Sequence, residues 1–247
     1  MKCLLLVYGE YRSADVATKT WNILNNNVDV VVRTQNQSNH YSEALRKQHG
    51  NHKIVKNDIT KLFGDCEIQL EPLDEWMRDN PNNDRNLNIR DFRYLYKRVS
   101  DKIDNYDVVA ISRLDSTFYI HDFERFLNEY DKETIYVNQK VVVHEKGKNF
   151  IQDHCYFGSS KVIGNFLKNL PTEVIDSHYE IADYILENFK HQVWDGFSSI
   201  HLRLSMKPFF EKHFSVNGKI KNKDDEYLQF FRKFMNNTHL KLERIQK

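Results

Sequence analysis

Asp115 is the residue whose place in the sequence points most directly to chemistry. A continuous apolar run from Val108 to Ile111, typical of a buried strand, ends in Ser-Arg-Leu-Asp at residues 112–115. Ligands of open α/β sheets bind at the carboxyl ends of strands. A carboxylate there can hold a divalent metal and, through it, a diphosphate. Arg113 can neutralise the same diphosphate or partly replace the metal. The alternative is a salt bridge between Arg113 and Asp115.

Two further arginines follow predicted strands. The first strand ends in the loop Tyr8-Gly9-Glu10-Tyr11-Arg12, in which Gly9 permits close backbone approach and Arg12 can pair with a phosphate or stack on a base. The helix that follows this loop favours anions at its start. Arg33 ends the second strand, so parallel strands would bring Arg12 and Arg33 to one crevice. A plain tight turn with solvated arginines is an equal alternative.

The remaining candidates are weaker. Asp153, just before a short predicted strand, can act as a base or orient an acceptor hydroxyl, and a turn-capping role is equally compatible. Arg90, Arg93 and Lys97 share one helix face, for which a solvated basic surface is the favoured interpretation. His178 and His201 are possible metal or phosphate contacts, although plain surface or core histidines are more common.

The elements that must position these residues alternate between strand and helix. Strands are predicted at residues 1–7, 28–32, 67–70, 108–111, 134–137, 141–144 and 155–158. Helices are predicted at residues 14–25, 89–105, 122–130 and 160–169, and after Pro171 at 178–190, 200–214 and 225–236. The first two strands and their helix form a βαβ unit, which predicts a parallel pair.

The bulk properties fit one domain. The chain has 247 residues. Residues 1–170 are expected to form an α/β core and residues 171–247 a helical portion that completes it. Acceptor binding, packing on the core and dimerisation fit this portion equally, so the oligomeric state stays open. A net charge of +1 argues against a nucleic-acid partner held by overall charge, and no apolar stretch is long enough to span a membrane. Three scattered cysteines without CxxC indicate a reducing, cytoplasmic setting.

The order of these motifs resembles that of GT-A fold glycosyltransferases, notably small bacterial and viral enzymes of polysaccharide synthesis. Residues 8–12 are similar to the Gly-x-x-Arg loop that contacts the nucleotide. Residues 106–115, together with the predicted helix that precedes them, resemble the family's "YD-strand-RxD" segment. Residues 153–159 resemble its acceptor-side D-x-x-x-x-G-S segment.

This resemblance implies a GT-A-like, Rossmann-type sheet, mixed but mostly parallel, flanked by helices and followed by a helical C-terminal portion. It implies a hexosyl- or pentosyltransferase that moves a sugar from a nucleotide-diphosphate sugar to a glycan or polysaccharide acceptor. Asp115 would take the metal or diphosphate, and Asp153 the acceptor side. Mn²⁺ or Mg²⁺ is the expected cofactor, but the usual DxD pair reads Arg-Leu-Asp here, so its first carboxylate is missing. Nucleotide or donor contacts are assigned to Tyr8, Gly9, Arg12, Arg33, Arg93 and Arg113.

Two other functions stay open. The missing carboxylate slightly favours a catalytically degenerate domain that binds a nucleotide or a glycan. A sugar nucleotidyltransferase is the third possibility, although that class usually carries a Gly-rich loop and residues 8–12 contain one glycine. If the transferase assignment holds, replacing Asp115 by alanine is expected to abolish donor turnover and leave the fold intact.

Overall fold

A seven-stranded sheet forms the centre of the protein. The computed structural model describes residues 1–37, 53–72, 87–120, 123–137, 142–143, 149–150, 155–171, 177–194 and 197–198. Across the sheet the strand order is β10-β6-β9-β4-β1-β2-β3. These strands are β1 (Cys3–Tyr8), β2 (Val28–Gln35), β3 (Glu67–Glu71), β4 (Val108–Arg113), β6 (Thr134–Val137), β9 (Cys155–Ser159) and β10 (Lys190–Val193). Only β9 runs antiparallel to its neighbours within this sheet. The predicted mixed, mostly parallel α/β fold of Rossmann type is confirmed.

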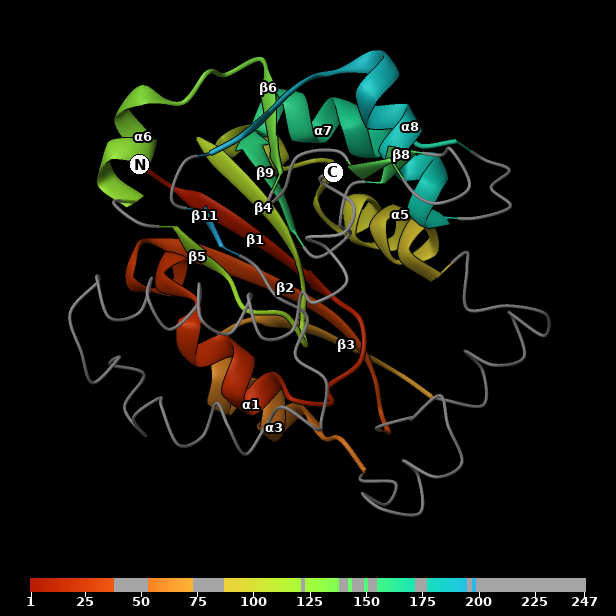
Figure 1. Cartoon of the computed structure of the whole chain (residues 1–247). Helices are drawn as coiled ribbons and strands as arrows, with labels where there is room; N and C mark the ends of the chain where they lie inside the picture. Colours follow the sequence, from red (N-terminus) through yellow and green to blue (C-terminus); the bar gives the residue numbers. More distant parts are fainter. Residues whose placement is uncertain are drawn as a thin grey trace.

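Helices cover both faces of the sheet (Figure 1). The helices are α1 (Ala14–Ala17), α3 (Lys56–Phe63), α5 (Leu87–Val99), α6 (Phe123–Glu129), α7 (Ser160–Lys168) and α8 (Ser177–Asn188). One apolar cluster joins the sheet to α5, α7 and α8, and a second joins it to α1, α3 and α6. Two short antiparallel pairs complete the described elements: β5 (Tyr119–Ile120) with β11 (Phe197–Ser198), and β7 (Val142–Val143) with β8 (Asn149–Phe150). None of the described helices is long and apolar enough to cross a membrane.

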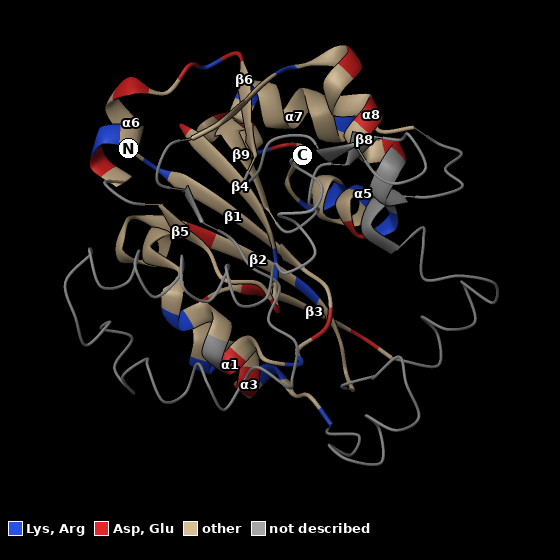
Figure 2. Cartoon of the chain, in the orientation of Figure 1, with Lys and Arg blue, Asp and Glu red and all other residues tan. Residues whose placement is uncertain are grey.

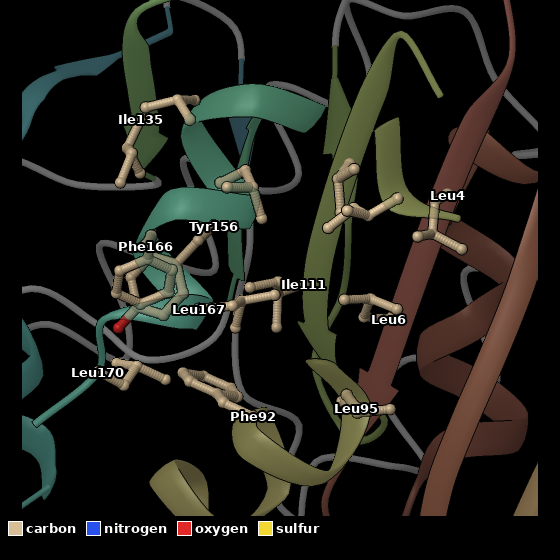
Figure 3. Packing of buried hydrophobic residues seen from close by; sticks show 14 of the residues in the cluster. Leu4, Leu6, Phe92, Leu95, Ile111, Ile135, Tyr156, Phe166, Leu167 and Leu170 are labelled. Carbon is tan, nitrogen blue, oxygen red and sulfur yellow. The ribbon is translucent and has the colours of Figure 1, made fainter. Parts of the chain in front are cut away.

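The central strands are apolar throughout because both of their faces are covered. All six residues of β1 are buried, which explains its unbroken run of apolar residues. Leu4 and Leu6 of β1 lie on the face of α5 and α7, whereas Leu5 lies on the other face. On the α5 side, Phe92 and Phe166 belong to the same apolar cluster as Leu6 and its β4 neighbour Ile111, and Phe166 lies beside Tyr156 (Figure 3).

The structure corrects several predicted boundaries. The helix expected at residues 14–25 breaks after α1 into two 3-10 turns, Thr18–Thr20 and Asn22–Asn25. The hydroxyls of Thr18 and Thr20 donate to the Ala14 and Ala17 carbonyls, at 2.7 and 2.8 Å, which competes with a regular helix. The helix expected at residues 89–105 ends at Val99 and is followed by a 3-10 turn, Ile103–Asn105.

The portion after Pro171 also differs from the prediction. It contains a helix, α8, but it also supplies the strands β10 and β11, which the sequence analysis did not predict. The helices expected at residues 200–214 and 225–236 lie outside the described residues. The helix α3 was not predicted from the sequence.

The strand order sets the position of a ligand site. After β1 the chain adds β2 and β3 on one side, and then returns to add β4 on the other side of β1. In open α/β sheets, ligands bind outside the carboxyl ends of the strands at such a switch point. The expected site therefore lies where β1 and β4 end.

Two residues of the D-x-x-x-x-G-S segment have structural roles. A Cβ atom at Gly158 would lie 2.8 Å from the Thr134 carbonyl oxygen and 2.9 Å from Cγ1 of Val162. The Ser159 hydroxyl accepts a hydrogen bond from the Val162 amide at 3.2 Å and so caps α7. Glycine and serine are therefore required here by the packing of β9 and α7, whatever the protein binds.

We expect Gly158→Ala to destabilise the protein by about 1–3 kcal/mol, because the new methyl group would press against backbone in a closely packed sheet. Gly164→Ala is the matched control. Its Cβ would meet Ile103 at ordinary contact distances of 3.6 and 3.7 Å, and alanine favours a helix over glycine by roughly 0.5–1 kcal/mol. Urea unfolding of both variants measures the difference. Equal stability of the two would contradict this account of Gly158.

Candidate functional site

Charged residues lie at the carboxyl edge of the parallel strands, whereas the interiors of β1 and β4 are uncharged (Figure 2). The described ion pairs at this edge join four arginines to four carboxylates: Arg12, Arg33, Arg90 and Arg113 with Glu10, Glu71, Asp91 and Asp115. Their side chains are 0–23% exposed. Buried ion pairs add little net stability because desolvation offsets their attraction. Such a set at a strand edge is therefore a candidate functional site.

The loop after β1 carries the first pair. Gly9 has a φ of +97°, a conformation that favours glycine, and it turns the chain out of the strand. Glu10 then receives two hydrogen bonds from Arg12, at 2.7 Å from Nε and 2.9 Å from Nη2. This two-pronged geometry fixes the plane of the guanidinium group.

Asp115 connects this loop to the end of β4. Its Oδ2 atom lies 3.4 Å from Nη1 of Arg12, and its Oδ1 atom accepts a hydrogen bond from Nε of Arg113 at 3.1 Å. The Asp115 side chain is completely buried. The Leu114 amide also donates to the Tyr8 carbonyl at 2.7 Å, so the ends of the two strands are joined by backbone as well. Asp115 thus bridges the switch point between β1 and β4.

Hydrogen bonds to the segment that forms the two 3-10 turns hold the loop that carries Asp115. The Trp21 indole donates to the Ser116 carbonyl at 2.7 Å, and the Phe118 amide donates to the Thr20 hydroxyl at 3.1 Å. These contacts limit the movement of the loop and hold Asp115 in place, which is the support a binding side chain needs.

Arg33 is the centre of the second group. Its Nη2 atom donates to Oε2 of Glu71 at 2.8 Å, and the same carboxylate oxygen accepts from Arg90 at 3.1 Å. Its Nε atom lies 3.0 Å from Oδ1 of Asp91, close enough for an ion pair but without hydrogen-bond alignment. The guanidinium carbon lies 4.2 Å from the centre of the Tyr94 ring, a cation–π contact.

Strand register brings the two groups onto one row. Tyr8 pairs in register with Arg33 of β2 on one side and with Arg113 of β4 on the other. Because side chains alternate along a strand, both arginines lie on the face that carries α5, and two strand spacings separate them by about 10 Å. Asp91, on α5, is electrostatically coupled to both.

Burial changes the proton affinity of two of the carboxyl groups. Desolvation raises the pKa of Asp91 to about 6, although Arg33 and Arg90 oppose the rise. Desolvation also raises the pKa of Glu10, against the lowering effect of Arg12. The ionised form of each carboxylate is therefore held at a cost.

The predicted site residues separate into two sets. Arg12, Arg33, Arg113 and Asp115 belong to the cluster, and Gly9 shapes its loop. The Tyr8 ring is buried, with its centre 4.8 Å from that of Phe92, so a nucleotide contact by this ring stays a prediction. Arg93 donates instead to the Leu170 and Pro171 carbonyls. Asp153 and His201 lie outside the described residues, as does the side chain of His178.

Four members of the cluster were missed or misjudged from the sequence. Glu10 was noted only as part of a loop, and Glu71 and Asp91 were not identified as site residues. The expected solvated basic face holds for Lys97, which is exposed, but is wrong for Arg90, which is partly buried against Glu71. For Glu10 the available signal was its place two residues before Arg12 in the loop after the first strand, whereas nothing in the sequence marked Glu71 or Asp91.

The described residues do not fit a divalent metal ion. Mn²⁺ and Mg²⁺ need several oxygen ligands, but the Asp115 and Glu10 oxygens face arginine nitrogens. Within the described ranges, no three His, Cys, Asp or Glu side chains come together as a possible metal site. Metal dependence stays a prediction.

Comparisons with known proteins assign no family. No protein-family model matches the chain, and no curated protein matches it with significance. The fold and the site define a Rossmann-like α/β protein with an arginine–carboxylate cluster at its switch point. Function must be argued from this geometry and from the sequence resemblance.

The raised pKa of Asp91 predicts a specific pH dependence of stability. Because its folded pKa of about 6 exceeds its ordinary value of 3.8, the native state binds more protons between these values, and its stability falls as the pH rises through this window. The loss of the Asp91 proton should lower the free energy of unfolding by roughly 1–2 kcal/mol between pH 5 and pH 7.5. Asp91→Asn should lose this contribution, whereas the exposed Asp104→Asn should retain it. Urea unfolding at both pH values tests this, and parallel curves for wild type and Asp91→Asn would refute it.

The structure also changes the expectation for Asp115→Ala. Removing this carboxylate leaves two poorly solvated guanidinium groups without it, so we expect a loss of about 3–5 kcal/mol rather than an intact fold. Asp115→Asn keeps the shape and an acceptor oxygen and should cost less. Thermal unfolding of both variants gives the comparison. An alanine variant as stable as wild type would contradict the bridging role.

Proposed function

We propose that the protein is a glycosyltransferase that uses a nucleotide-diphosphate sugar and transfers the sugar to a glycan or polysaccharide acceptor. The observation that carries the proposal is the arginine cluster at the switch point of the sheet. Four guanidinium groups in two neighbouring ion-paired groups are suited to a ligand with two phosphate groups, because one guanidinium group can bind two phosphate oxygens. The GT-A resemblance of residues 8–12 and 106–115 supports the same assignment.

The chemistry of sugar transfer accounts for the arginines. When the bond between the sugar and the diphosphate breaks, the departing nucleoside diphosphate takes up negative charge. Positioned cations stabilise that charge most effectively where water is excluded. Arg12 and Arg113 are held in fixed orientations by Glu10 and Asp115. In this proposal they contact the diphosphate, and Arg33 contributes from β2. These arginines would then neutralise the diphosphate in place of a metal ion, as the Arg-Leu-Asp sequence at residues 113–115 suggests.

The acceptor side of the proposal depends on Asp153, which lies outside the described residues. Because β9 runs antiparallel to β4, its first residue, Cys155, pairs with Ser112 near the edge where β4 ends. Asp153 precedes Cys155 by two residues in the sequence. An acceptor hydroxyl near that edge would need a base if the reaction inverts the sugar, and Asp153 is our candidate.

Thermal unfolding with UDP-glucose, GDP-mannose and dTDP-glucose, each with and without Mn²⁺, tests the donor site. A ligand that binds only the native state stabilises it by about 2.7 kcal/mol at a hundred times its Kd. We expect one of these nucleotide sugars to raise the melting temperature. Arg12→Gln and Arg113→Gln should lose most of the shift, because each removes a phosphate contact.

Arg98→Gln is the control, since Arg98 is exposed and pairs with Glu67 away from the cluster. It should keep the full shift. Release of the nucleoside diphosphate with and without a glycan acceptor then separates a transferase from a domain that only binds. A shift without any turnover would favour the degenerate binding domain, and no shift with any donor would reject the donor site.

A further inference from the structure

We infer that Asp91 is a positioning residue that competes with the anionic ligand for Arg33 and takes up a proton when that ligand binds. This inference rests on the proposed binding of a diphosphate at the carboxyl edge of the sheet. It concerns how that site accepts negative charge.

The described cluster carries no net charge when all of its groups are ionised. Four arginines and four carboxylates cancel when all are ionised. A diphosphate entering this poorly solvated network adds negative charge that the cluster does not compensate. Uncompensated charge in such surroundings is costly, and the affected groups change protonation instead. One of the four carboxylates is thus expected to gain a proton.

Asp91 is the carboxylate best placed to gain it. Four charged groups act on Asp91: Arg33 from β2, Glu71 from β3, Arg113 from β4 and Arg90 from its own helix. Its contact with Arg33 is an ion pair of 3.0 Å without hydrogen-bond alignment, whereas Glu10 is held through both oxygens by Arg12. From a pKa of about 6, a further rise of roughly 2–3 units keeps Asp91 protonated at pH 7.5.

The row of arginines shows why the ligand and Asp91 compete. Arg33 and Arg113 lie on either side of Tyr8 on the face covered by α5, and Asp91 is coupled to both. A phosphate group that draws Arg33 toward the strand edge weakens its pairing with Asp91. Glu71 and the Tyr94 ring still orient the guanidinium group. Arg33 therefore stays in position while it pairs with the ligand instead of with Asp91.

Isothermal titration calorimetry of the full chain tests the inference, with UDP-glucose, GDP-mannose and dTDP-glucose as probes. The diphosphate of a nucleotide sugar is esterified at both ends and does not titrate near neutral pH. Titrations at pH 7.5 in HEPES and in Tris, which differ in ionisation enthalpy, count the protons taken up. We expect close to one proton, and a Kd about ten- to thirtyfold higher at pH 8 than at pH 6.5.

Two variants separate this role from a merely structural one. Asp91→Asn should bind without proton uptake and with a Kd that does not change over this pH range. Glu71→Gln removes the other partner of Arg33, so it should change the affinity but keep the proton uptake. Binding by the wild type without proton uptake, or equal uptake by Asp91→Asn, would overturn the inference and leave the donor site standing. No binding of any probe at either pH would reject the donor site and the inference together.

Discussion

Among the described residues, eight charged side chains share the carboxyl edge of this sheet, and each arginine among them is held by a carboxylate that is itself poorly solvated. The constraint is mutual, because removing any one partner leaves an opposite charge in surroundings that solvate it badly. The turn at Gly9, the loop fixed by Trp21 and the docking of α5 near β2 all bring these partners within reach of one another. An apolar edge would have been cheaper for stability alone. Stability alone therefore does not account for the charged edge.

The fold could be read from the sequence where the signal was local and strong. The apolar runs of β1, β2 and β4 gave the parallel core, since strands buried on both faces are apolar at nearly every position. The strand β10 was not predicted because its residues, Lys-His-Gln-Val, are mostly polar and lie at the sheet edge, where only one neighbour is needed. The break after α1 depends on threonine hydroxyls that bond back to the chain, and propensity alone does not show this.

The candidate site could be predicted in part: three of its arginines and Asp115 were identified from the sequence, whereas Arg90 and the other carboxylates were not. Arg12, Arg33, Arg113 and Asp115 lie at or shortly after the ends of the strands predicted from the apolar runs, so their position in the sequence identifies them as candidates. Asp91 lies in the first turns of a helix, and Glu71 is the last residue of an edge strand; neither position singles out a site residue in the sequence. They join the site through the register of β2 with β3 and the packing of α5 on the sheet. Such long-range pairing appears only when the chain is folded.

The reversed strand β9 has a consequence for how the chain is made. The four parallel strands β3, β2, β1 and β4 all come from the first 113 residues, whereas β9, which covers the free side of β4, begins at Cys155. While the chain is being synthesised, the apolar β4 therefore waits without its second neighbour until more than forty further residues have been added. An uncovered apolar strand edge is a template for pairing with another chain. Products that end before Cys155 are accordingly the ones expected to aggregate, and the timing of β9 sets how long each new molecule is exposed to that risk.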